Sequence, residues 1–146
     1  MSAARLAAHC LELLGPVAGP VELVAPRRRH LATALDGACR ASADRPPAAA
    51  IVVLLGVPAR TAERQATLRA LERRLPAGAP LLLVDHNQPR ALARRVLATA
   101  LLALRRMGPT RARYPAAREL AALGFEVERL RLACGERVQL VLARRR

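Results

Sequence analysis

The chain has 146 residues, and its 25 basic side chains, all arginine, outnumber 11 acidic ones, giving a formal net charge of +14. Its three cysteines are widely spaced and form no CxxC pair, so the sequence indicates neither a disulfide framework nor a zinc site. Tyr114 and Phe125 are the only aromatic residues, which argues against a protein that stacks single-stranded bases on its rings. The positive charge keeps one functional hypothesis open, that of a basic module that binds nucleic acid or another polyanion.

No apolar run reaches the roughly 18–20 residues that a membrane span requires. Residues 1–15 have the rhythm of an amphipathic helix rather than that of a signal peptide. We therefore expect a cytoplasmic protein without a membrane partner. The length suggests one domain, here residues 1–146.

Five short segments predict strands, and they are residues 21–25, 49–56, 80–85, 125–133 and 137–145. The second and third are continuous apolar runs, which is typical of strands buried on both faces of a parallel sheet. The last two alternate apolar and polar residues and are joined by the short turn Cys134–Glu136, so they predict an antiparallel hairpin.

Helical patterns fill the gaps, at residues 5–14, 30–41, 61–75, 89–107 and 115–123. In the fourth helix we expect an inner apolar stripe made of Leu92, Val96, Ala100, Ala103 and Leu104. The alternation of helix and strand up to Gly124 predicts an α/β fold. It would be a three-layer, Rossmann-like, mostly parallel sheet of about five strands, ending in the antiparallel hairpin.

Four consecutive stretches carry a family resemblance: "AAIVVLLGVP", "LRALERRLPAGAPLLLVD", "ARELAALGFEVERLRL" and "RVQLVLARR". In this order they resemble the last four strands, with the segments between them, of class I S-adenosylmethionine-dependent methyltransferases. The resemblance covers residues 50–145. It implies an enzyme that uses S-adenosylmethionine and transfers a methyl group to an acceptor that the residues do not identify.

The N-terminal third departs from this family. The family's first strand ends in a glycine-rich loop, where the backbone approaches the cofactor closely, and an acidic residue after its second strand holds the ribose. Here the strand at 21–25 is followed by Pro26 and Arg27–Arg29, without a glycine. The alternative function is therefore a catalytically inactive methyltransferase-like domain that acts as a binding or regulatory partner, as a homodimer or with another protein.

The strand at 21–25 has two placements. It could take the place of the family's second strand, or that of the first strand with the second and third skipped. We favour the first-strand place, because an empty slot in the sheet would expose two rows of unpaired backbone groups. A sequence that lacks its N-terminal part is a third possibility.

Ligands of open α/β sheets lie beyond the carboxyl ends of the strands. The residues that would bind the cofactor there are Ala25, Arg27, Gly56, Val57, Pro58 and Asp85. Asp85 and His86 are candidates for the catalytic role. The alternatives without a catalytic role are that Asp85 accepts hydrogen bonds in a turn and that His86 is an ordinary loop residue. No metal-ligand cluster is visible in the sequence, so we expect no metal site. Methyl transfer suits that absence, because it depends mainly on holding two reactants close and aligned.

Overall fold

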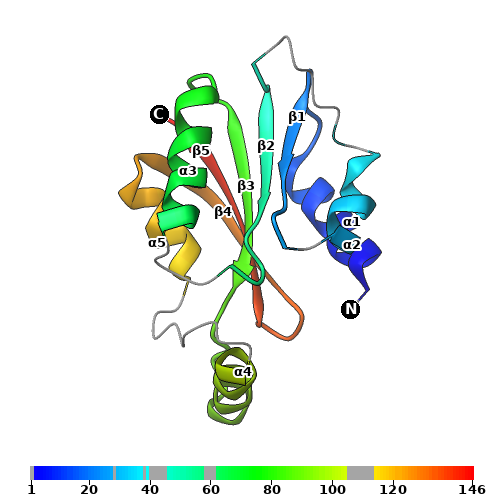
Figure 1. Cartoon of the computed structure of the whole chain (residues 1–146), viewed down its shortest axis with the longest axis vertical. Coiled ribbons are helices and arrows are strands. Elements are labelled where there is room, and N and C mark those ends of the chain that lie inside the picture. Colours follow the sequence, from blue (N-terminus) through cyan, green and yellow to red (C-terminus); the bar gives the residue numbers. More distant parts are fainter. Residues whose placement is uncertain (1, 28, 38, 40–45, 58–61, 105–113) are drawn as a thin grey trace.

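The computed structural model describes residues 2–27, 29–37, 39, 46–57, 62–104 and 114–146. Within them a five-stranded sheet has the order β1-β2-β3-β5-β4 (Figure 1). The strands are β1 (Val21–Val24), β2 (Ala49–Val53), β3 (Pro80–His86), β4 (Phe125–Ala133) and β5 (Val138–Arg145). β1, β2 and β3 are parallel, whereas β5 runs antiparallel to both β3 and β4. The predicted Rossmann-like α/β fold with its C-terminal hairpin is confirmed.

The strand β1 lies directly beside β2, with Leu23 opposite Ile51 and Val24 opposite Val52. The sheet therefore has no empty slot between these strands, which is the arrangement that the backbone-pairing argument favours. As a consequence, β1 forms one edge of the described sheet. It has only four residues, and a short edge strand offers little backbone for pairing with another chain.

Four helices cover the two faces of the sheet (Figure 1). One face packs against α1 (Ala3–Leu14) and α2 (Arg29–Asp36), and the other against α3 (Ala62–Arg74) and α5 (Pro115–Ala122). Successive residues of a strand point to opposite faces, so the continuous apolar runs of β2 and β3 feed both halves of the core. Each fully buried leucine contributes roughly 1.5–3 kcal/mol to this packing.

The helix α4 (Leu92–Leu104) contradicts the prediction made for it. The expected inner stripe points outward, with Leu92 72% and Leu104 81% exposed, while Ala98 and Leu102 are the buried residues of the helix. The helix lies beyond the end of β3 instead of against the sheet (Figure 1). The reason is local, because residues 87–89 are buried at the end of the sheet and the helix starts only after them.

The link between α1 and β1 runs close to the residue that precedes β2. Gly19 has a φ of +140°, and a Cβ built on it would lie 2.8 Å from the Cβ of Ala48. A side chain at position 19 is therefore disfavoured both by the backbone conformation and by the close approach of Ala48. Within the described ranges, no helix has both the length and the apolarity needed to cross a bilayer.

Candidate functional site

The carboxyl ends of β1, β2 and β3 meet at one edge of the sheet, because the three strands are parallel. Arg27 follows β1 and reaches across to the residues after β2, where its Nη1 donates a hydrogen bond to the carbonyl oxygen of Gly56 at 3.3 Å. Gly56 has a φ of +96°, a left-handed conformation that favours glycine. The structure thus brings Arg27 and Gly56 together at this edge, whereas Ala25 packs against the core half under α1 and α2.

Two other predicted cofactor residues do not join this group. Val57 is buried in the core between the sheet and α3, and its N–H donates to the carbonyl oxygen of Leu54 at 3.0 Å. Pro58 lies outside the described residues. The contacts of Val57 are therefore those of a core residue that closes the turn after β2.

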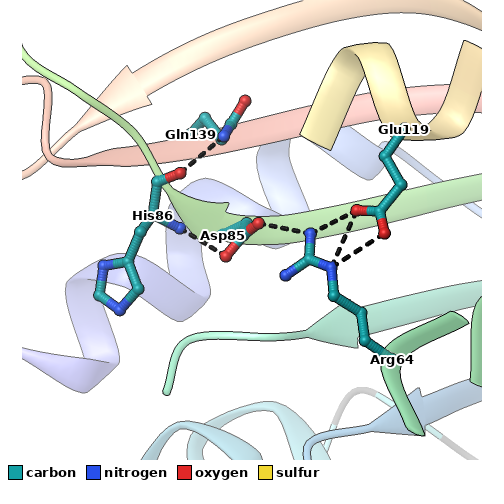
Figure 2. A network of polar contacts seen from close by, with 5 residues as sticks. All are labelled: Arg64, Asp85, His86, Glu119 and Gln139. Carbon is teal, nitrogen blue, oxygen red and sulfur yellow. Dashed lines mark hydrogen bonds and ion pairs between the residues drawn. The ribbon is translucent and has the colours of Figure 1, made fainter. Parts of the chain in front are cut away.

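The two candidates for catalysis, Asp85 and His86, point to opposite faces of the sheet. Val84 belongs to the core half under α1 and α2, and Leu83 to the half under α3 and α5. Alternation along the strand then sends Asp85 toward α3 and α5 and His86 toward the opposite face. Figure 2 shows the same divergence, with the imidazole ring turned away from the Asp85 carboxylate. The two side chains cannot act as a pair on one ligand.

Asp85 is part of a buried ion triad (Figure 2). Arg64, from α3, is only 2% exposed. Its Nη2 donates to Asp85 Oδ2 at 2.6 Å and to Glu119 Oε2 at 2.5 Å. Its Nε also donates to the two carboxylate oxygens of Glu119, at 3.0 and 2.9 Å. One guanidinium therefore holds two carboxylates and ties α3, β3 and α5 together. We name this group the Arg64 triad.

Burial and charge act in opposite directions in the Arg64 triad. Burial raises the pKa of the Asp85 carboxyl above its ordinary value, and the charge and hydrogen bond of Arg64 oppose that rise. Burial acts to lower the pKa of the Arg64 guanidinium, but the hydrogen bonds and charges of Glu119 and Asp85 raise it overall. The guanidinium therefore stays charged, and its removal would leave a carboxylate in an apolar surrounding.

Both carboxylate oxygens of Asp85 have partners within the chain. Oδ2 accepts from Arg64, and Oδ1 accepts from the backbone N–H of His86 at 2.7 Å. Asp85 is only 5% exposed. These contacts favour its plain interpretation as a structural acceptor at the end of a strand, and its role as a ligand contact stays a prediction.

The sequence held a signal for the triad that pattern reading missed. Arg64 lies on the same helical stripe as Leu68, Leu71 and Leu75, one turn before the first of them. Burial of an arginine is costly unless its charge is paired. Asp85 ends the apolar strand that follows this helix, so it is the nearest acidic candidate in the sequence pattern.

Asn87 holds three segments together just beyond β3. Its Nδ2 donates to the carbonyl oxygen of Glu136 at 2.9 Å, and its Oδ1 accepts from the backbone N–H of Tyr114 at 3.1 Å. Next to it, Gln139 Nε2 donates to the carbonyl oxygen of His86 at 2.7 Å (Figure 2). This buried network fixes the chain after β3 against the hairpin turn and the start of α5. Within the residues that the structure covers, no group of three or more metal-ligating side chains occurs.

No family model and no curated protein matches this sequence. Among solved structures, the glycopeptide N-methyltransferase MtfA, in complex with sinefungin, is 14% identical with a TM-score of 0.63, covering 100% of this chain and 95% of its own. Human N-acetylserotonin methyltransferase, in complex with S-adenosylmethionine, is 15% identical with a TM-score of 0.61, over 97% of this chain and 51% of its own. The N-methyltransferase NodS from Bradyrhizobium japonicum is 11% identical with a TM-score of 0.53, over 97% of this chain and 93% of its own.

This chain has the class I methyltransferase fold. At these identities the likeness concerns the fold alone. The chain is thus methyltransferase-like in its fold, and β1 lies directly beside β2 in its sheet.

The residues at the carboxyl edge do not fit S-adenosylmethionine. In the methyltransferases that the sequence resembles, glycines after the first strand let the backbone approach the cofactor, whereas here Pro26 and Arg27 follow β1. The carbonyl of Gly56 already accepts from Arg27. The Asp85 carboxylate at this edge already accepts hydrogen bonds from Arg64 and from the His86 N–H.

Proposed function

We propose that this chain is a methyltransferase-like domain that has lost the cofactor site and acts as a binding partner rather than as an enzyme. One observation carries the proposal. The loop after β1 has no glycine, and its Arg27 guanidinium lies on the carbonyl of Gly56, which follows β2. In a methyltransferase the backbone after the first strand has to approach the cofactor closely.

A second candidate function is methyl transfer with S-adenosylmethionine to an acceptor of unknown identity. It is supported by the solved structures that share the fold and contain S-adenosylmethionine or sinefungin. The left-handed conformation of Gly56 also supports it, because it keeps the turn after β2 free of a side chain. In this candidate, Arg27 would have to leave the Gly56 carbonyl before the cofactor enters.

Titration calorimetry separates the two candidates. S-adenosylmethionine and S-adenosylhomocysteine are titrated to millimolar concentration into the wild type, Arg27→Ala and, as a matched control, Arg118→Ala, which removes an exposed arginine on α5. We expect no saturable heat for the wild type or Arg118→Ala. Saturable binding by the wild type, with a Kd below about 1 mM or −4.1 kcal/mol, would contradict the proposal. Binding by Arg27→Ala alone would identify this side chain as the block.

A further inference from the structure

The helix α4 carries an apolar face that points away from the rest of the protein. Its exposed large side chains are Leu92, Val96, Leu97, Leu101 and Leu104. At 3.6 residues per turn they fall, with the exposed alanines 93, 100 and 103, on about half of the helix circumference. We call this face the α4 arc. A surface helix normally turns such a face toward the core, so the α4 arc requires another partner.

The position of α4 makes this face accessible. The helix lies beyond the carboxyl ends of the parallel strands, apart from the two helical layers (Figure 1). Its buried residues, Ala98 and Leu102, are on the side opposite the α4 arc. A broad, flat partner can therefore contact the α4 arc while the body of the protein stays behind the helix.

Positive charge borders the α4 arc. Arg90 and Arg94 are exposed, and Arg95 turns inward, where its Nη2 donates to the carbonyl oxygen of Arg90 at 3.2 Å. Residues 89–104 of the sequence contain three arginines and no acidic residue, and Glu136 of the hairpin turn accepts a hydrogen bond from the Arg90 backbone N–H at 2.8 Å. A second copy of the chain would bring like charges together, since each copy carries a net charge of +14. The charge of this region is complementary to an anionic surface.

The chemistry of the α4 arc favours lipid over a macromolecule. All of its side chains are leucine, valine or alanine, so it has no hydrogen-bonding group with which to recognise a nucleic acid or a specific polar epitope. Exposed aliphatic side chains bordered by arginine are the features of helices that lie in the interface of an anionic membrane.

We propose that α4 docks this protein on an anionic lipid membrane. The helix would lie parallel to the surface, with the α4 arc at the boundary of headgroups and acyl chains and Arg90 and Arg94 at the lipid phosphates. Its 13 residues are about 20 Å long, shorter than a hydrocarbon core of about 30 Å, so it lies on the bilayer. This departs from the expectation of no membrane partner, and it does not depend on whether the carboxyl edge binds a cofactor.

Vesicle sedimentation tests the proposal with the full chain. The protein is mixed with phosphatidylcholine vesicles that contain or lack phosphatidylserine, at low and at physiological salt. We expect binding to the anionic vesicles that weakens with salt. Val96→Glu with Leu97→Glu should reduce the bound fraction by about tenfold or more, and Arg94→Glu should reduce it by about tenfold on anionic vesicles only.

The matched control is Val127→Glu with Leu130→Glu, which adds the same two negative charges and removes the two other exposed large apolar side chains found in the described residues, both on β4. All variants change exposed side chains, and thermal unfolding checks that they fold. The proposal is overturned if the wild type stays in the supernatant with anionic vesicles, or if the β4 control loses binding as strongly as the α4 variant. It is also overturned if sedimentation equilibrium shows a dimer that Val96→Glu with Leu97→Glu dissociates, since a second copy would then cover the α4 arc.

Discussion

Replacing Arg64 by methionine removes the cation of the Arg64 triad and keeps most of its volume. Asp85, 5% exposed, then keeps only the His86 N–H as a partner for its charge. Removal of one partner from a buried ion pair costs about 3–5 kcal/mol. The Glu119 side chain is 23% exposed, so it can turn toward solvent, and most of the loss comes from Asp85. We therefore expect Arg64→Met to lower the free energy of unfolding by about 3–5 kcal/mol at pH 7.

The loss should depend on pH in a defined direction. Without Arg64 nothing in the triad opposes burial, so the pKa of Asp85 in the folded variant rises further above its unfolded value of about 3.9. Below the unfolded pKa the carboxyl is protonated in both states and costs no stability. Stability is then lost as the pH rises through the folded pKa. The deficit of Arg64→Met should therefore be small near pH 4 and larger at pH 7.

Urea unfolding followed by circular dichroism from pH 4 to pH 8 measures this deficit. The double variant Arg64→Met with Asp85→Asn keeps an acceptor for the His86 N–H and removes the buried charge, so it should recover at least half of the loss. The control is Arg73→Met, on the exposed side of α3, which should unfold within about 0.5 kcal/mol of the wild type. A deficit of Arg64→Met that is independent of pH, or no recovery in the double variant, would refute this reasoning.

Two further predictions use the same preparation. Gly19→Ala should lower the free energy of unfolding by about 1–3 kcal/mol, because its φ is unfavourable for alanine and its Cβ would lie 2.8 Å from another Cβ. The control Gly37→Ala, whose Cβ would meet nothing within 4 Å, should not lower it. Equal effects of the two variants would count against the close approach of the α1–β1 link to Ala48. Burial raises the pKa of the Cys10 thiol to about 12. At pH 8 a thiol reagent should therefore label the half-buried Cys134 first and Cys10 only on unfolding. Peptide mass spectrometry that finds equal labelling rates for Cys10 and Cys134 in the native protein would contradict this prediction.

The parts of the fold that depend on local pattern could be predicted from the sequence. The continuous apolar runs at 49–56 and 80–85 gave two neighbouring parallel strands, and the turn Cys134–Glu136 gave the hairpin. The place of β1 followed from a rule on unpaired backbone groups rather than from its residues. These inferences succeed because strand pairing and burial leave a periodic trace in the sequence.

The parts that depend on which element covers which face could not be predicted in the same way. The periodicity of α4 identified an apolar face, but it did not show that residues 87–89 would carry the helix past the sheet. The polar residues Asp85 and Asn87 at the end of β3 are buried, which the local pattern did not indicate. Asp85 faces α3 and α5 by strand alternation, but its ion partners come from Arg64 and Glu119, which are distant in the sequence.

Co-crystallisation of the protein with millimolar S-adenosylhomocysteine shows whether the carboxyl ends of β1 and β2 accept a cofactor. We expect the Arg27 guanidinium to remain on the Gly56 carbonyl and no nucleoside to lie at the carboxyl ends of β1 and β2. A nucleoside bound there, with Arg27 displaced, would overturn the proposed loss of the cofactor site and favour a cofactor-binding methyltransferase.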